Sequence, residues 1–289
     1  MQQGFERCRA AVDERLAEYF TERASYAVLL ESMRYSLLAG GKRIRAVLCL
    51  KLCEAAGGAV EDALDAACAI EMLHAYSLIH DDLPCMDDDD LRRGKPSNHI
   101  RFGEFTATLA GDALQAAAFE TLLNAKLPPA TVAGMGRVLA EAAGPRGICG
   151  GQYLDLSGEG KHQTRNGLEE THKLKTAALI SASAKLGVLA AGGMQEQIRA
   201  AAEYASAVGF AFQIRDDLLD YTATPEDFGK PIGSDKKNEK STFAALLGAD
   251  ECEKLIAAET ERAISALDGA FIDAGFLIWF ARMLAQRKY

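Results

Sequence analysis

The chain carries, from residue 81 to residue 93, the acidic stretch Asp81-Asp82-Leu83-Pro84-Cys85-Met86-Asp87-Asp88-Asp89-Asp90-Leu91-Arg92-Arg93. Six carboxylates fall within ten positions, and two arginines follow shortly after them. Carboxylates this close raise one another's pKa unless a cation lies among them, and hard divalent ions such as Mg²⁺ take oxygen ligands of this kind. Taken alone, the run Asp87 to Asp90 is also typical of a solvated acidic loop.

A second acidic cluster, Asp216-Asp217-Leu218-Leu219-Asp220, follows much later in the chain. If this segment is helical, Asp216 and Asp220 lie one turn apart on the same face. The cluster directly follows the apolar run 210–214, and burying aspartates beside such residues is costly unless they are paired or bind metal. A solvated acidic loop does not explain this second cluster, whereas a metal site does.

A basic segment near the start, Gly40-Gly41-Lys42-Arg43-Ile44-Arg45, places a glycine turn ahead of a predicted helix. Backbone amides at the helix start and the side chains of Lys42 and Arg45, three positions apart, can converge on a phosphate. Surface turns often have the same composition. Together with the two acidic clusters, the segment indicates a site where several Mg²⁺ ions and basic side chains hold a polyphosphate.

The residues before the first acidic stretch are predicted to form a helix that leads into it. On this helix His74, Ser77 and Asp81 share one face, because they are three and seven positions apart. Taken alone, His74 is also typical of a hydrogen-bonded histidine in a core. Pro84 is expected to end the helix at about Leu83, since the residue before a proline disfavours the α region.

Composition and charge exclude several classes of protein. The net charge of −9 argues against nucleic-acid binding, which calls for a basic face. Seven cysteines include no Cys-x-x-Cys pair, and no signal peptide is recognised, so we expect free thiols in a reducing cytoplasm. The most apolar stretch, 274–285, is interrupted by Arg282 and falls short of the roughly 20 residues that a membrane span needs.

The abundance of alanine and leucine and the scarcity of proline predict an all-α fold. Breaks at glycine and proline place helices at residues 3–20, 25–39, 42–56, 60–83, 103–125, 130–143, 146–158, 168–191, 195–222, 240–248, 250–269 and 270–287. We expect one domain over residues 1–289, formed by a bundle of about ten or more helices. The segment 224–239 is the longest non-helical candidate and could form a mobile flap.

Four motifs between Gly40 and about Leu247 resemble those of the trans-isoprenyl diphosphate synthases, and among these the bacterial farnesyl diphosphate synthase (geranyltranstransferase) group. They are the Gly-Lys-Arg segment, Asp-Asp-x4-Asp followed by Leu91-Arg92-Arg93-Gly94-Lys95-Pro96, the pair Lys175-Thr176, and Phe212-Gln213-Ile214-Arg215-Asp216-Asp217-Leu218-Leu219-Asp220. The resemblance implies an isoprenoid-synthase-like homodimer with a central cavity, which uses Mg²⁺ and no organic cofactor.

The resemblance also implies a role for each residue of these motifs. The metal ligands would be Asp81 and Asp87 for two Mg²⁺ ions and Asp216 for a third, with Asp220 acting through water. The allylic diphosphate would be contacted by Arg92, Lys175, Lys230 and Lys240, although Lys236 or Lys237 could replace either of the last two. The diphosphate of isopentenyl diphosphate would be held by Gly41, Lys42, Arg45, His74 and Arg93. The carbocation would be faced by Gln213 and Thr176.

These residue types fit a condensation that joins isopentenyl diphosphate to dimethylallyl or geranyl diphosphate, giving (2E,6E)-farnesyl diphosphate. Mg²⁺, lysine and arginine would stabilise the leaving diphosphate where its charge develops. The cation left behind needs a dry apolar pocket, because water would otherwise capture it. The departed diphosphate is the expected base, which explains why no dedicated acid and base stand out.

Product length is expected to depend on Tyr76 and Ser77. Tyr76 lies five positions before Asp81, about 7 to 8 Å along the helix axis. An aromatic ring at that depth is expected to stop the prenyl tail at three isoprene units, whereas the small Ser77 leaves the space above it open. Taken alone, Tyr76 is also typical of an ordinary core residue.

Four alternative functions compete with this interpretation. A synthase of geranyl or geranylgeranyl diphosphate would share every motif. A terpene cyclase needs no second diphosphate site, so Lys42, Arg45 and Arg93 argue against it. The pair His80-Asp81 could belong to a metal-dependent phosphohydrolase, which would leave the second aspartate cluster unused. An inactive regulatory subunit would be expected to lack one aspartate motif, and both are complete.

Overall fold

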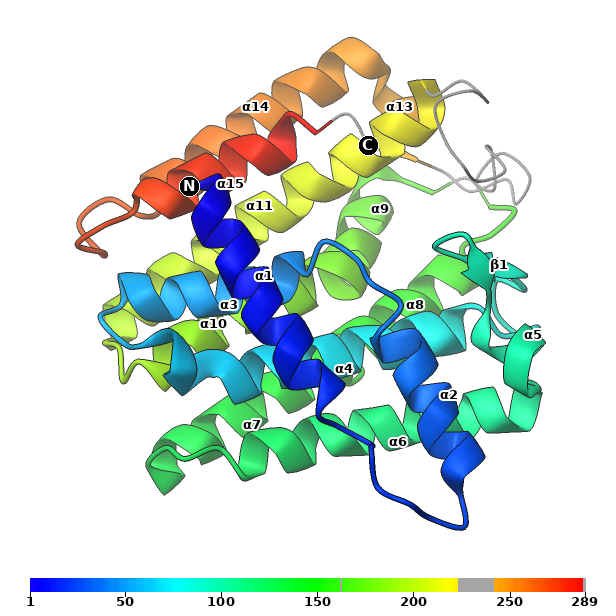
Figure 1. The fold of residues 1–289 in the computed structure, drawn as a ribbon. Coiled ribbons are helices and arrows are strands. Elements are labelled where there is room, and N and C mark those ends of the chain that lie inside the picture. The colour runs from blue at the N-terminus through cyan, green and yellow to red at the C-terminus, as the bar shows by residue number, and fades with distance from the viewer. Residues whose placement is uncertain (162, 223–241, 288–289) are drawn as a thin grey trace.

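The structure, a computed structural model, describes residues 1–161, 163–222 and 242–287 and is built almost entirely from helices (Figure 1). The first half contains α1 (Gln2–Ala17), α2 (Ala27–Leu37), α3 (Ile44–Ala55), the short 3-10 helix η1 (Val60–Ala63), α4 (Leu64–Asp81), α5 (Asn98–Phe102), α6 (Glu104–Leu123) and α7 (Pro129–Ala143). The second half contains α8 (Ile148–Ser157), α9 (Arg165–His172), the π-helix η2 (Lys173–Ala177), α10 (Ala178–Ala190), α11 (Gln195–Thr222), α13 (Phe243–Leu247), α14 (Ala249–Ser265) and α15 (Gly275–Ala285). The predicted all-α fold is confirmed.

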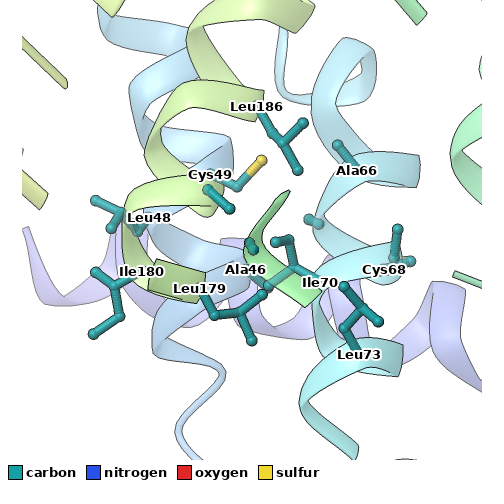
Figure 2. Packing of buried hydrophobic residues seen from close by; sticks show 14 of the residues in the cluster. Ala46, Leu48, Cys49, Ala66, Cys68, Ile70, Leu73, Leu179, Ile180 and Leu186 are labelled. Carbon is teal, nitrogen blue, oxygen red and sulfur yellow. The ribbon is translucent and has the colours of Figure 1, made fainter. Parts of the chain in front are cut away.

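Helix α4 lies in the middle of the bundle and packs against α3, α6 and α10 (Figure 1). Every residue from Ala66 to Leu73 is buried, so this helix has no solvent-exposed face along that length. A helix that is buried all round is enclosed by others. Figure 2 shows Ile70 and Leu73 of α4 beside Leu179 of α10 within this core. The acidic stretch therefore begins at the end of a helix that is largely enclosed by others.

Close packing of α10 on α3 depends on a glycine. A Cβ at Gly187 would lie 2.1 Å from the carbonyl oxygen of Cys49, which no other residue could tolerate without moving a helix. Because α3 carries the basic segment at its start, this contact fixes where that segment lies relative to α4.

The second acidic cluster lies on α11, and a smaller group of buried residues holds that part of the helix. Ala211, Ile214 and Leu218 recur at helical spacing and pack with Phe243 of α13 and Ile256 of α14. The face that remains carries Gln213, Asp216 and Asp220, which recur at intervals of three and four. The apolar face thus determines which way the acidic face points.

Several predicted boundaries were wrong. The predicted helix 168–191 begins at Arg165, where the Thr164 side chain accepts a hydrogen bond from the Gly167 amide, and it is interrupted by the π-helix. The loop predicted between residues 84 and 102 contains α5 and a two-stranded antiparallel hairpin, β1 (Leu91–Arg92) and β2 (Lys95–Pro96). The predicted helix 270–287 spans only Gly275–Ala285. The predicted flap, 224–239, lies outside the described residues.

Candidate functional site

The first acidic stretch folds back on itself at the end of α4. Asp81 is the last residue of the helix, and the Asp87 amide donates a 2.9 Å hydrogen bond to the Asp81 carbonyl oxygen. Pro84 follows three positions later, which agrees with the predicted stop. The turn brings the backbones of the two aspartates predicted to bind Mg²⁺ together at one end of the bundle.

The hairpin that follows is fastened to α2, and this positions the two arginines. The Tyr35 hydroxyl donates to the Pro96 carbonyl oxygen at 2.7 Å, and Asn98 Nδ2 donates to the Ser32 carbonyl oxygen at 2.9 Å. Arg93 adopts a positive φ of 54° at the turn. These hydrogen bonds explain how a hairpin with strands of only two residues is held in a defined position against α2.

Arg92 lies against the acidic stretch. Its Nε donates to Asp82 Oδ1 at 2.9 Å, and its Nη2 lies 3.3 Å from Asp89 Oδ2. The Asp82 side chain is buried, and this burial raises the pKa of its carboxyl while the Arg92 guanidinium opposes the rise. The predicted contact of Arg92 with an allylic diphosphate stays a prediction.

Arg45, His74 and Arg93 form a basic cluster where α3 meets α4, in which the two arginines carry the positive charge. Arg45 Nη1 lies 3.5 Å from His74 Nε2, and Arg93 donates to the Gly40 carbonyl oxygen. Burial lowers the pKa of His74 well below its usual value, and the neighbouring Arg45 and Arg93 lower it further. The buried Arg45 Nε has no hydrogen-bond partner within the described part of the chain. Such a cluster of buried donors fits an anion.

Gly41 allows the Arg93 side chain to reach this cluster. Its φ is 128°, and a Cβ there would lie 2.9 Å from Arg93 Nη1. Any larger residue would therefore strain the turn and push the guanidinium away. Lys42 follows directly, and burial and the nearby Arg287 lower its pKa. The structure thus brings Gly41, Arg45, His74 and Arg93 together, whereas Lys42 lies near Arg287 and Asp216.

Arg43 has a different role from its basic neighbours. Its side chain is only 4% exposed and donates to Asp13 Oδ1 at 2.9 Å, Glu71 Oε2 at 3.0 Å and the Leu37 carbonyl oxygen at 2.8 Å. Glu71 is 3% exposed, so the two form a buried ion pair. Arg43 fastens α3 to α4, whereas Lys42 and Arg45 remain the residues of this segment that are predicted to contact substrate.

Lys175 and Asp81 meet between the π-helix and α4. Lys175 Nζ lies 2.7 Å from Asp155 Oδ2 and 3.7 Å from Asp81 Oδ1, while Gln152 Nε2 also donates to Asp81 Oδ1. Burial raises the pKa of Asp81, and Lys175 opposes this. Sequence reasoning missed Gln152 and Asp155, both on α8. The π-helix is a local widening that is often found at functional sites.

Thr176, Gln213 and Asp217 form a hydrogen-bonded chain. Thr176 Oγ1 donates to Gln213 Oε1 at 2.8 Å, and Gln213 Nε2 donates to Asp217 Oδ1 at 2.9 Å. Asp217 Oδ2 in turn accepts from the Phe243 amide at 3.0 Å. The middle aspartate of the second cluster therefore orients the Gln213 amide, and Gln213 orients Thr176.

Asp216 is paired with the C-terminal Arg287. The carboxylate forms an ion pair with Arg287 Nη2, and the guanidinium carbon lies 3.7 Å from the centre of the Phe212 ring. Burial raises the pKa of Asp216 to about 6, against the opposing effects of Arg287 and Lys42. Asp220, one turn later, is exposed. The only hint of Arg287 in the sequence is the basic composition of the tail.

A cavity of about 410 Å³ extends from this polar rim into the bundle. Arg45, His74, Asp81, Lys175 and Thr176 line its polar end. The rest of its lining is more apolar and consists of Tyr76, Ser77, Leu78, His80, Met86, Ile148, Cys149, Gln152, Tyr153, Leu156 and Leu179. The arrangement is an apolar pocket whose mouth is lined by both cations and a carboxylate.

The donor set fits Mg²⁺ held together with a substrate. Within residues 1–161, 163–222 and 242–287, no three or more His, Cys, Asp or Glu side chains are close enough to hold a metal alone. Mg²⁺ is usually bound by one or two carboxylates plus substrate phosphates, and Asp81 and Asp216 are half-buried carboxylates of this kind. The predicted ligands Lys230 and Lys240 of the allylic diphosphate lie outside the described residues.

The chain is similar to proteins of one family. The polyprenyl synthetase family model matches residues 26–268. A farnesyl diphosphate synthase of Geobacillus stearothermophilus is 43% identical over 97% of this chain and 96% of its own length. A chloroplastic geranylgeranyl pyrophosphate synthase of Capsicum annuum is 45% identical over 84% of this chain, which covers 66% of that relative. The apo structure of an FPP/GFPP synthase from Zymomonas mobilis matches with a TM-score of 0.86 at 34% identity, over 99% of this chain and 97% of that one. The chain therefore belongs to the polyprenyl synthetase family.

Proposed function

We propose that the chain is a trans-prenyltransferase that condenses isopentenyl diphosphate with dimethylallyl or geranyl diphosphate to give (2E,6E)-farnesyl diphosphate and diphosphate. The observation that carries this proposal is the mouth of the cavity, where the basic cluster lies beside the carboxylate of Asp81 and its buried Arg45 Nε has no hydrogen-bond partner among the described residues. A condensing enzyme needs two diphosphate sites of different character above one apolar pocket.

The allylic diphosphate would bind between the two aspartate clusters. We propose that Asp81 and Asp87 on one side, and Asp216 with Asp220 on the other, hold three Mg²⁺ ions. Bound Mg²⁺ would stabilise the negative charge of the departing diphosphate. Lys175 is already held within reach of this site by Asp155, and Arg92 by Asp82, so both cations are positioned before the substrate arrives.

The carbocation left by the allylic substrate would form inside the cavity. The apolar part of its lining would keep water from the cation, which water would otherwise convert to an alcohol. Thr176 and Gln213 present oxygen atoms whose orientation is fixed by Asp217, so these dipoles can face the positive charge. Arg45, His74 and Arg93 would hold isopentenyl diphosphate with its double bond toward the cation.

We also propose a homodimer in which each chain forms one domain, located in the cytoplasm. The exposed side of α6 carries Phe105 and Leu109 one turn apart, 77% and 50% exposed, and Leu123 further along, 60% exposed. Apolar side chains this exposed on one helix favour burial against a second copy. All seven cysteines are free, which supports a reducing compartment. None of the described helices is both long and apolar enough to traverse a bilayer.

The dependence of geranyl diphosphate consumption on isopentenyl diphosphate tests this function. We expect geranyl diphosphate and Mg²⁺ alone to remain nearly unchanged, and diphosphate to be released once isopentenyl diphosphate is added. Release of phosphate or diphosphate at the same rate without isopentenyl diphosphate would instead indicate a phosphohydrolase or a terpene cyclase. The chelator EDTA should stop the condensation.

The position of Tyr76 favours farnesyl over geranylgeranyl diphosphate as the product, although relatives of both kinds exist. The ring lines the cavity and is only 7% exposed, so it forms part of the wall. We expect Tyr76→Ala to extend the product to geranylgeranyl diphosphate or beyond, because the truncated side chain leaves space for another isoprene unit. Chromatography of the dephosphorylated alcohols checks this. An unchanged C15 product would mean that other residues limit the chain.

Replacing one arginine of each proposed diphosphate site should have different kinetic effects for the two substrates. Arg45→Ala is expected to raise the KM for isopentenyl diphosphate about 10- to 100-fold, the cost of one charged hydrogen-bonding contact, with a smaller change in kcat. Arg92→Ala should mainly lower kcat, by about 100-fold, because the allylic diphosphate gains charge in the transition state. Steady-state kinetics with each substrate varied measures both. A raised allylic KM with an unchanged isopentenyl KM in Arg45→Ala would show the sites reversed.

A further inference from the structure

The Tyr76 hydroxyl is hydrogen-bonded across the cavity wall to a cysteine on another helix. Its oxygen lies 3.3 Å from Cys149 Sγ, in the first turn of α8, and both residues line the cavity. Burial raises the pKa of Tyr76, and the hydrogen bond to Cys149 raises it further, while Gln115 lowers it. The end of the ring is therefore held by contacts with α8 and α6.

The other edge of the Tyr76 ring is supported by a histidine that cannot easily move. His80 packs edge-on against the ring, with centroids 5.3 Å apart, and its Nε2 donates to the Thr108 carbonyl oxygen at 3.0 Å. A Cβ at Gly111 would lie 2.2 Å from His80 Nε2, so α6 encloses the imidazole closely. Tyr76 is thus backed by a fixed neighbour on the α6 side and reaches Cys149 with its hydroxyl.

Cys149 also borders a second hollow outside the cavity. This more open pocket of about 400 Å³ is lined mainly by apolar residues, namely Pro145, Cys149, Gly150, Tyr153, Leu154 and Leu174. Cys149 and Tyr153 line both spaces. The contact between Tyr76 and Cys149 therefore lies at the boundary between the inner cavity and an apolar space that could receive a longer tail.

We propose that Cys149 is a positioning residue for product length, which holds the Tyr76 ring across the end of the cavity through its thiol. This inference rests on the proposed prenyltransferase function. While the hydrogen bond is intact, the ring stops the growing tail at three isoprene units. When the bond is absent, the ring can turn and a fourth unit can pass toward the outer pocket.

The C20 to C15 product ratios of four variants test this role. They are measured with isopentenyl diphosphate in excess over dimethylallyl diphosphate. We expect Cys149→Ala to raise the C20 to C15 ratio about 2- to 10-fold, the effect of one net hydrogen bond. Tyr76→Phe, which keeps the ring and loses the hydroxyl, should raise it equally, and the double variant should add nothing more. Cys149→Ser keeps a hydrogen-bonding group, so its ratio should match that of the wild type.

The outcomes distinguish this inference from the function on which it rests. A wild type that makes C15 product, with Cys149→Ala at the same ratio, would overturn the inference alone. The inference would also be overturned if Cys149→Ser raised the C20 to C15 ratio as much as Cys149→Ala does. The size of the cysteine side chain, and not its hydrogen bond, would then limit the product length. A wild type that makes no prenyl product at all would overturn the proposed function and this inference together.

Thiol labelling gives a readout that does not require turnover. Cys85 and Cys149 are the exposed cysteines and the other five are buried, so in a Cys85→Ser variant a maleimide should label Cys149 first. With Mg²⁺ present, farnesyl diphosphate should slow this labelling strongly, because its tail reaches the end of the cavity. Inorganic diphosphate and geranyl diphosphate should protect little. Equal labelling with farnesyl diphosphate and inorganic diphosphate would contradict the proposal.

Discussion

Asp81→Ala and Asp216→Ala are each expected to lower turnover at least about 10³-fold, because each removes a carboxylate that we propose holds Mg²⁺ at the leaving diphosphate. Asp81 ends α4 beside Lys175, and Asp216 lies on α11. Turnover is measured at saturating substrates and Mg²⁺. Near wild-type turnover in either variant, with metal still required, would contradict the assignment.

Folding should survive both substitutions. Burial raises the pKa of both carboxyls, so the fold disfavours their charged forms, but each carboxylate also pairs with a cation, Lys175 or Arg287. Circular dichroism in metal-free buffer should therefore show both variants folded, with at most a modestly lower melting temperature. Asp220→Ala is a suitable control, because Asp220 is exposed and is expected to act only through water. Its loss of turnover should be clearly smaller than that of Asp216→Ala.

Arg43→Ala is expected to lower the free energy of unfolding by about 3–5 kcal/mol, because it leaves the buried Glu71 carboxylate without its cation. The two side chains are 4% and 3% exposed and lie 3.0 Å apart, so water cannot replace the lost partner. Denaturant unfolding measures this change. An unfolding midpoint equal to that of the wild type would show that the pair contributes nothing to stability.

Lys42→Ala is the matched control for Arg43→Ala. Lys42 is the preceding residue in the same turn and is exposed, so its replacement should change the free energy of unfolding by no more than about 0.5 kcal/mol. Together, the two variants distinguish the structural role of Arg43 from the substrate-binding role that we propose for Lys42. Lys42→Ala should instead weaken isopentenyl diphosphate binding.

The sequence alone was sufficient to predict the helical class and the position of Asp81 near the end of a helix, because these depend on local patterns. The apolar α4 and the proline after it determine where the first acidic stretch begins, and both are visible in consecutive residues. Likewise, the spacing of Asp216 and Asp220 fixes a shared helical face once α11 is recognised.

Other features depend on contacts between distant segments and could not be predicted in this way. Spacing cannot distinguish Arg43 from Arg45, because the difference arises from a positive φ of 50° at Arg43 and from Glu71 on another helix. Gln152 meets Asp81 from 71 positions away, and Arg287 meets Asp216 from the same separation. No short-range pattern carries such pairings.

The hairpin and the π-helix were missed for a different reason. Strands of two residues, such as Leu91–Arg92, are too short to produce an alternating pattern. The π-helix at Lys173–Ala177 adds one residue to a turn within a continuous helical sequence, so the pattern on either side still predicts a single helix.

The most direct test of the central claim is the mass of the product formed from dimethylallyl diphosphate and isotopically labelled isopentenyl diphosphate with Mg²⁺. The account predicts a C15 alcohol after dephosphorylation that contains two labelled units, and no such product without Mg²⁺. If the folded protein formed no prenyl chain longer than the starting C5 unit, the proposed prenyltransferase function would be contradicted.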